Sequence, residues 1–487
     1  MTTITVDSRI RIPVAGLSED LLSRLRRGCT HKNPDVAKQR AMGRFYTSLP
    51  AEICTWRNEG ATLTLPSGAM ARVRAAFNDA KVSFRVVDRR QEGAMVVSKN
   101  ALRYRGFPLR GYQVEMIEHA YAKERCVIRA STGSGKTVAA FALAAKIGLN
   151  TLVVLPNAKL LQQWLKRAKH DLGLDPNRVG IIRGAKRTLR PLTLATQQTL
   201  WSRKIDEELQ DFFGAIIVDE GHHAAARTFM QTIDSFPARY RVAFTADERR
   251  KDRKEFIVYD LVGEVAHEVS REECERVGAI VDVDVRVVFT DFSFDSYRMN
   301  SDFNALLDAM TINSDRNKIA LDIALDELRG GEQAILFTHR REHARDIDRA
   351  LLSRGVKSGC LLGAQEAGDE QEFEEMCVRL NDGSARAGVG TYQAAGEGID
   401  LPAVTVGVAM TPIGTNRQLF NQVRGRFCRI SPETGKSEGR LYVLHDQRIF
   451  DERVLRNIVA WNRTVNVLVG EKWIPGKEFL RRHRRAS

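Results

Sequence analysis

Short apolar runs of about five residues recur along two long stretches of the chain, with helical segments between them. The first set occupies residues 126–130, 151–155, 215–219 and 242–245, and the second occupies 334–338, 387–390, 404–408 and 441–444. Unbroken apolar strands of this length are typical of a parallel sheet that is covered by helices on both faces. The pattern therefore predicts an α/β fold with two successive parallel-sheet domains.

The first hundred residues have a different texture. Short helical and strand-like pieces alternate there with turn signals at Asn33-Pro34, Leu49-Pro50 and Pro66-Ser67-Gly68. We expect a small separate α+β domain. The predicted domains are residues 1–104, 105–275, 276–465 and a basic C-terminal tail, 466–487.

The net charge of +14 lies mainly at the two ends of the 487-residue chain. Residues 1–100 carry 17 Lys and Arg against 9 Asp and Glu, and the last seven residues add four arginines. Basic ends on a nearly neutral body indicate that a polyanion is gripped at the periphery. In residues 1–100 the basic residues are not interleaved with aromatic ones, which favours contact with a phosphate backbone over base stacking.

Other sequence signals exclude several classes of protein. The seven cysteines are scattered and never spaced C-x-x-C, so we expect reduced thiols rather than disulfides or a metal site. No run of 18 apolar residues exists, and we expect no membrane span. The first residues lack the features of a signal peptide, which favours a cytoplasmic location.

Residues 130–137 read Ala-Ser-Thr-Gly-Ser-Gly-Lys-Thr and lie between an apolar run and a helical stretch. Gly133 and Gly135 let backbone N–H groups turn toward phosphate oxygens, and a helix beginning at Thr137 adds its dipole. Lys136 can neutralise phosphate charge, and the Thr137 hydroxyl can ligate Mg²⁺. The segment predicts a nucleoside triphosphate site formed by Ser131, Thr132, Gly133, Ser134, Gly135, Lys136 and Thr137.

Two further sets of residues fit the same chemistry. Asp219 and Glu220 end an apolar run, where a carboxylate can hold Mg²⁺ and its neighbour can polarise the attacking water. Arg426 and Arg429 lie at i, i+3 spacing, so both can face one cleft from the second α/β domain. Arginines supplied from another domain would tie hydrolysis to domain closure, which is typical of a motor.

The sequence Asp219-Glu220-Gly221-His222 resembles the DExH box of superfamily 2 helicases and translocases. Segments resembling the other motifs of that family follow in the expected order over roughly residues 105–445. The segments are 109–113, 155–157, 196–200, 245–246, 338–340, 391–393 with 397–402, and 422–429. The resemblance implies two RecA-like domains with ATP between them and nucleic acid lying across both.

The resemblance also assigns individual roles. Gln113 would read the adenine, Arg110 would also bind the nucleotide, and Asp400 would bind it in the motif that contacts the ribose. The catalytic set would be Lys136, Glu220, Gln422, Arg426 and Arg429, with the metal on Thr137 and Asp219. The nucleic-acid contacts would be Pro156, Asn157, Thr196, Gln197, Thr338, His339 and Thr391. The chain departs from the family pattern at Asp247-Glu248, where a second Thr and a Pro are usual.

The DEGH box and the stretch 391–400 look most like the DNA-acting branch, which includes XPB-like proteins and phage branch-migrating helicases of the UvsW type. We therefore expect an ATP- and Mg²⁺-dependent DNA helicase or translocase acting on branched, forked or duplex DNA in replication, recombination or repair. The cell would be bacterial, or a host cell if a phage encodes the chain. Two alternatives are a motor subunit of a restriction or defence complex, with a partner that cuts, and an RNA helicase.

Overall fold

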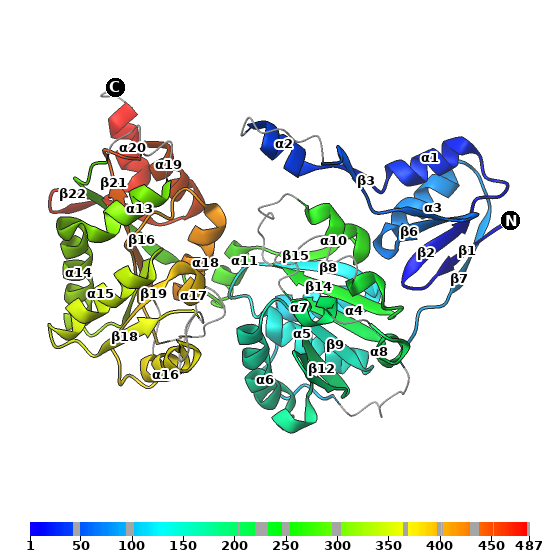
Figure 1. Cartoon of the computed structure of the whole chain (residues 1–487), viewed down its shortest axis with the longest axis horizontal. Helices are drawn as coiled ribbons and strands as arrows, with labels where there is room; N and C mark the ends of the chain where they lie inside the picture. Colours follow the sequence, from blue (N-terminus) through cyan, green and yellow to red (C-terminus); the bar gives the residue numbers. More distant parts are fainter. Residues whose placement is uncertain are drawn as a thin grey trace. The chain divides into compact units, whose positions relative to one another are not determined.

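The computed structural model describes residues 1–41, 49–93, 102–202, 205–219, 232–245, 254–294, 303–363, 369–396, 401, 403–428, 438–450 and 452–484. The chain divides into two compact units, Met1–Arg271 and Glu272–Ser487, which are described separately (Figure 1). The first unit holds a small N-terminal domain and an α/β domain, and the second unit is a second α/β domain. The α/β class expected from the apolar runs is confirmed.

The N-terminal domain has a five-stranded sheet with the order β5-β6-β2-β1-β7. Helices α1 and α3 pack on one face through Leu21, Leu25 and Phe77, which are buried with the strand residues Ile4 and Ile10 (Figure 1). A hairpin of β3 and β4 and helix α2 complete the domain. The bounds are β1 Thr2–Val6, β2 Arg9–Pro13, α1 Glu19–Arg27, β3 Thr30–Lys32, α2 Pro34–Ala41, β4 Glu52–Cys54, β5 Arg57–Glu59, β6 Thr62–Pro66, α3 Met70–Asp79 and β7 Phe84–Asp88.

The first α/β domain is built on a sheet with the order β11-β10-β12-β9-β13-β14-β8-β15, in which the described pairs are parallel except β10 with β11. The strands are β8 Arg125–Ala130, β9 Thr151–Leu155, β10 Gly180–Arg183, β11 Lys186–Thr188, β12 Leu192–Thr196, β13 Ala215–Asp219, β14 Tyr240–Thr245 and β15 Val265–Val269. The helices are α4 Gly111–Lys123, α5 Lys136–Ile147, α6 Ala158–Leu172, α7 Gln197–Ser202, α8 Glu207–Phe212 and α10 Glu255–Leu261, and α11 Arg271–Arg276 begins at the split between the two units.

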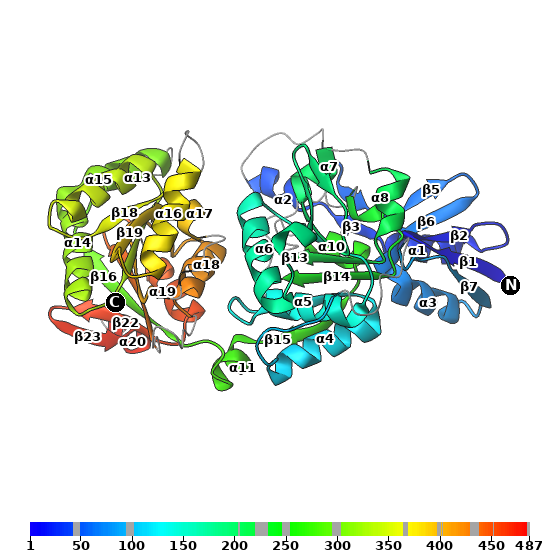
Figure 2. The ribbon, with the colours of Figure 1, turned by 90° about the horizontal axis from the view of Figure 1, so that it is seen from below.

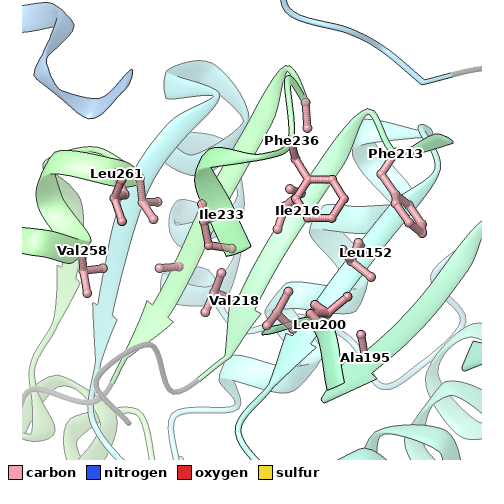
Figure 3. Packing of buried hydrophobic residues seen from close by; sticks show 14 of the residues in the cluster. Leu152, Ala195, Leu200, Phe213, Ile216, Val218, Ile233, Phe236, Val258 and Leu261 are labelled. Atoms are coloured by element: carbon pink, nitrogen blue, oxygen red, sulfur yellow. The ribbon is translucent and has the colours of Figure 1, made fainter. Parts of the chain in front are cut away.

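Helices cover both faces of this sheet. Helices α4 and α5 lie on one side, and α7 and α8 lie on the other (Figure 2). On the second side, Leu200 of α7 and Val258 and Leu261 of α10 belong to one buried apolar cluster with Ile216 and Val218 of β13 (Figure 3). Because the sheet is buried on both faces, successive residues of β13 are all apolar up to its last position.

The N-terminal domain is joined to this α/β domain by buried polar contacts. Asp260 of α10 is almost fully buried and accepts hydrogen bonds from His31, Thr55 and Arg72, at 2.8, 2.5 and 2.6 Å. Arg241, at the start of β14, donates to the Ser67 hydroxyl at 2.8 Å and is itself fully buried. The Asp260 carboxylate is paired with Arg72, and Arg241 donates further hydrogen bonds to the carbonyls of Leu261, Ser8 and Phe236, so both buried groups have polar partners.

The second α/β domain has a sheet with the order β18-β19-β17-β20-β21-β16-β22-β23, parallel except for the β22–β23 pair. Its strands are β16 Val283–Thr290, β17 Ala334–Thr338, β18 Ser358–Leu361, β19 Ala387–Thr391, β20 Val406–Ala409, β21 Gly439–Asp446, β22 Val465–Val469 and β23 Lys472–Pro475. Its helices are α13 Phe303–Ile312, α14 Ser314–Arg329, α15 Arg341–Leu352, α16 Asp369–Asn381, α17 Tyr392–Gly396, α18 Arg417–Phe427, α19 Glu452–Trp461 and α20 Gly476–Arg484.

The segment expected as a separate basic tail, residues 466–487, is instead largely part of this domain. Strands β22 and β23 extend the sheet, and α20 packs back on them. Phe479 of α20 is buried, with its ring 5.5 Å from that of Phe289 in β16. The expectation rested on charge alone and was wrong for residues 466–484, because β22 and β23 pair into the sheet and Phe479 packs the basic helix that follows against it. The split between the units, at 271/272, falls close to the expected boundary at 275/276.

Candidate nucleotide-binding site and associated motifs

The loop between β8 and α5 has the backbone shape that its glycines allow. Gly133 and Gly135 have φ values of +89° and +81°, in the left-handed region, where a side chain would be strained. A Cβ at Gly135 would also lie 2.4 Å from the Gln113 side-chain nitrogen. Helix α5 begins directly after Gly135, so its unpaired N–H groups and its dipole are at the loop.

Side chains of helix α4 form hydrogen bonds with the same loop. The Tyr112 hydroxyl and the Gln113 amide both donate to the Ser134 carbonyl, at 2.9 and 3.1 Å. The Gln113 side-chain oxygen accepts from the Arg110 backbone N–H at 3.0 Å. Both ends of the Gln113 amide are thus bound within the protein, and its adenine role stays a prediction. Arg110 is exposed at the start of α4.

The polar groups of the loop fit a phosphate ligand. The Lys136 side chain is buried, and its ammonium donates to the Ala130 carbonyl at 3.2 Å. Ser134 is fully buried, and its hydroxyl has no hydrogen-bond partner within the described part of the chain. A cationic side chain, helix N–H groups and an unsatisfied hydroxyl at one loop are suited to holding an anion such as a polyphosphate.

Asp219 ends β13 at the same edge of the sheet. Only β14 separates β13 from β8, and the three strands are parallel. Asp219 is 6% exposed, and its Oδ2 atom accepts a hydrogen bond from the Trp164 indole at 3.0 Å. Thr137 lies in the first turn of α5. A carboxylate and a hydroxyl at one sheet edge are a suitable donor set for Mg²⁺, which prefers oxygen ligands.

Four residues predicted to contact nucleic acid lie at the ends of two neighbouring strands or directly after them, at this edge. Thr196 of β12 pairs with Leu155 of β9, and Pro156 and Asn157 follow β9 while Gln197 follows β12. The Asn157 side chain caps α6 by accepting from the Leu160 N–H at 2.9 Å. Thr196 is buried, and its hydroxyl is bonded to that of Thr199 at 2.8 Å. The structure brings these segments together, and their contact with nucleic acid stays a prediction.

The corresponding edge of the second domain holds Thr338, His339 and Thr391. Thr338 and Thr391 are directly paired across β17 and β19. The Thr338 hydroxyl is completely buried and bonded to His343 Nδ1 at 2.8 Å, so it supports the edge rather than lying on its surface. His339 Nδ1 is 2.7 Å from the Thr411 hydroxyl, and burial lowers its pKa to about 4, so the ring is neutral at pH 7.

The arginines of helix α18 differ in their burial and in their contacts. Arg424 is buried and donates to the Trp461 carbonyl at 2.7 Å and to the Asn462 side chain at 3.0 Å. Gln422 and Arg426 are half-buried and lie four residues apart, on one side of the helix. Arg424 therefore holds α18 in its own domain, whereas Gln422 and Arg426 lie together on one side of the helix, and their catalytic roles stay predictions.

Several predicted residues lie outside the described part of the chain. They are Glu220, Gly221, His222, Ala246, Asp247, Glu248, residues 397–400 with Asp400, and Arg429.

Two supporting residues were not predicted. Trp164 and Tyr112 both act through partners remote in the sequence; Tyr112 lies in the motif-like segment 109–113, but neither residue was assigned a role. Within the described ranges no disulfide joins any of the seven cysteines, no cluster of metal-binding side chains is found, and no helix could cross a bilayer.

In the first α/β domain, a loop with two glycines in the left-handed region follows a parallel strand, and a lysine begins the next helix. A carboxylate ends the strand two positions away in the sheet. These features define the domain as a nucleotide-binding domain of the phosphate-loop class. Two family models match the chain in tandem. "Type III restriction enzyme, res subunit" matches residues 106–249. "Helicase conserved C-terminal domain" matches residues 316–431.

The chain is also similar to known proteins over most of its length. It is 27% identical to the "DNA 3'-5' translocase XPB2" of Sulfurisphaera tokodaii, over 66% of this chain and 78% of that protein. It is 28% identical to the "DNA 3'-5' helicase XPB" of Mycobacterium tuberculosis, over 69% of this chain and 60% of that protein. Among solved structures, the fragment of a putative HsdR subunit of a type I restriction enzyme from Vibrio vulnificus covers 78% of this chain and 72% of its own, with a TM-score of 0.54 and 19% identity.

The HsdR likeness shows that the fold is shared. With the two family models, the relatives confirm the predicted resemblance: the chain belongs to superfamily 2 of helicases and translocases, with distant homology to XPB-like proteins. The two α/β domains are accordingly RecA-like, and the protein is an ATP-hydrolysing enzyme of that superfamily.

Proposed function

We propose that the chain is an ATP-dependent DNA translocase or helicase. The observation that carries the proposal is the ordered set of groups in its two domains: a phosphate loop with Lys136 and Asp219 in the first, and Arg426 on α18 in the second. Lys136 would neutralise phosphate charge, and Thr137 and Asp219 would hold Mg²⁺. The metal supplies charge stabilisation at the transferring phosphoryl group.

The second domain would complete the reaction. Arg426 and Arg429 would stabilise charge at the γ-phosphate, Gln422 would support them, and Glu220 would orient the water. Because these groups belong to different domains, hydrolysis would require the domains to approach, and closing and opening would become movement along a strand.

Several observations support DNA as the substrate. The relatives just described carry names that state DNA and a 3′-to-5′ direction. The N-terminal domain carries exposed arginines suited to phosphate contacts; they include Arg24, Arg27, Arg74, Arg85 and Arg89. Because this domain is joined to the first RecA-like domain by buried contacts, DNA held on it would move with that domain. We extend the proposal to forked or otherwise branched DNA, in replication, recombination or repair.

The test has two stages. ATPase rates are measured with single-stranded DNA, duplex DNA, forked DNA and single-stranded RNA at one fixed salt concentration, because phosphate contacts are salt-dependent. Strand displacement is then compared on forks, four-way junctions and plain duplex. Stimulation by DNA and faster displacement on branched substrates are expected. Equal displacement on all three would contradict the branch preference, and stimulation by RNA alone would establish an RNA helicase.

A second candidate is the motor subunit of a restriction complex. The observation that favours it is the family model over residues 106–249, whose description is the res subunit of a type III restriction enzyme. In that case a separate protein would cut the DNA. Purification of the chain from its natural source with a nuclease partner, and DNA cleavage that needs both proteins and ATP, would favour this candidate over a free-standing helicase.

A further inference from the structure

Trp164 of α6 donates its indole N–H to the carboxylate of Asp219. The Nε1 to Oδ2 distance is 3.0 Å, and the two residues are only 1% and 6% exposed. The indole also packs against the Phe141 ring of α5, with 4.7 Å between ring centroids. Trp164 therefore lies between the helix that follows the phosphate loop and the strand that ends in Asp219.

The hydrogen bond distinguishes Trp164 from its neighbours. The other apolar residues on the buried side of α6 are Leu161, Leu165, Ala168 and Leu172, which fill the core and bring no polar atom into it. An indole N–H buried in this way needs an acceptor, and at this position its partner is the predicted metal ligand. A leucine or phenylalanine could fill the space, but neither could donate to Asp219.

We propose that Trp164 is a positioning residue for the magnesium ion of the bound nucleotide, acting through Asp219. The proposal rests on the proposed function. The indole N–H stabilises the ionised carboxylate and fixes its rotamer, so Asp219 is ordered before the metal arrives. Hydrogen bonds that orient a metal ligand commonly contribute 10- to 100-fold to metal affinity.

The test replaces Trp164 by Phe, which keeps a buried ring and removes the N–H. Binding of a fluorescent ADP analogue is titrated with Mg²⁺, and a parallel titration in EDTA gives the metal-free affinity. We expect the Mg²⁺ concentration at half-maximal binding to rise about tenfold, while the metal-free affinity changes little. An unchanged Mg²⁺ requirement in W164F overturns the proposal.

Phe141→Leu is the matched control, because it loosens the packing of the same indole and leaves the hydrogen bond in place. It should lower the Tm without changing the Mg²⁺ requirement; an equal rise in F141L would mean that packing alone is responsible. If W164F does not fold, 3-benzothienylalanine at position 164 keeps the shape of the ring with sulfur in place of the N–H. A wild-type chain without ATPase activity, together with a raised Mg²⁺ requirement in W164F, would contradict the proposed function and support this assignment.

Discussion

Arg9 of the N-terminal domain forms a salt bridge with Asp234 of the first RecA-like domain, and their side chains are only 5% and 8% exposed. Burial lowers the pKa of Arg9 and raises that of Asp234, and each residue opposes the shift of the other. Neither charge would be tolerated there alone. Asp234 belongs to the segment that leads into β14, so the small domain is fixed to the motor domain close to its sheet.

Replacing Arg9 by Met should strongly destabilise the first unit. The change leaves the Asp234 carboxylate buried without its main partner, which commonly costs about 3–5 kcal/mol. The measurement is urea unfolding at pH 7, followed by tryptophan fluorescence. The double variant Arg9→Met with Asp234→Leu should recover part of the lost stability, because the lone carboxylate is removed while the buried Arg241 loses the favourable charge of Asp234.

The exposed pair Arg11 and Glu59 provides the control. Its atoms are 2.6 Å apart, but the side chains are 38% and 42% exposed. Arg11→Ala should change the free energy of unfolding by no more than about 1 kcal/mol. Similar losses in the Arg9 and Arg11 variants would show that burial does not govern the Arg9 pair.

Gly68→Ala should weaken the junction between the N-terminal domain and the first RecA-like domain. A Cβ at Gly68 would lie 2.3 Å from the Tyr259 carbonyl oxygen and 2.6 Å from that of Asp260, so the two backbones would have to separate. Limited proteolysis should then cut between the domains faster, and the Tm should fall. Gly111→Ala is the control, because its Cβ would meet nothing within 4 Å; cleavage at the wild-type rate in G68A would contradict the close approach.

The second domain should lose stability between pH 7 and pH 5. Burial lowers the pKa of His343 to about 4. The nearby Arg316 charge adds a smaller lowering, and the Asp346 charge opposes it. The unfolded state, with a pKa near 6.5, binds more protons throughout this window, so stability falls as the pH falls. His343 alone should account for about 2 kcal/mol between pH 7 and pH 5.

Urea unfolding of the whole chain at pH 7 and at pH 5 measures this dependence of the stability on pH. His343→Asn should make the stability less dependent on pH by about 2 kcal/mol, although it removes the hydrogen bonds to Thr338 and Asn317 and lowers stability at pH 7. If H343N were as sensitive to pH as the wild type, His343 would not be the group responsible.

The central strands could be predicted because burial on both faces makes them continuously apolar. The runs at 151–155, 215–219 and 334–338 coincide with β9, β13 and β17. Strands at or next to the edge of a sheet could not be predicted in this way. The edge strand β18 contains Ser358 and Gly359, and in β22, next to the edge strand β23, Asn466 interrupts the apolar run and bonds to Asp284 at 2.7 Å. Edge strands have fewer neighbours to cover them, so their sequences are less distinctive.

The loop of the site could be predicted for a different reason. Residues that approach phosphate are contiguous in the chain, and glycine is required at fixed positions in them. Supporting contacts have no such local pattern, because their partners are remote in sequence. Trp164 meets Asp219 across 55 residues, and Arg316 bonds to Asp446 across 130 residues, with both of the latter side chains fully buried.

Arg426→Ala should separate nucleotide binding from turnover. Arg426 lies half-buried on α18, whereas the phosphate loop belongs to the other unit. If Arg426 acts as an arginine finger, its loss should lower the DNA-stimulated kcat by about 10³-fold or more, and ATP should still bind through the loop. Lys136→Ala should instead weaken binding itself. The measurements are steady-state ATPase rates and equilibrium binding of a fluorescent ATP analogue.

Arg417→Ala supplies the comparison on the same helix, since Arg417 is exposed in its first turn and should be dispensable for turnover. Arg424 is unsuitable as a comparison because its bonds to Trp461 and Asn462 hold the helix in place. A DNA-stimulated kcat in R426A close to that of R417A would remove Arg426 from the reaction. The second domain would then contribute to DNA contact but not to phosphoryl transfer through this residue.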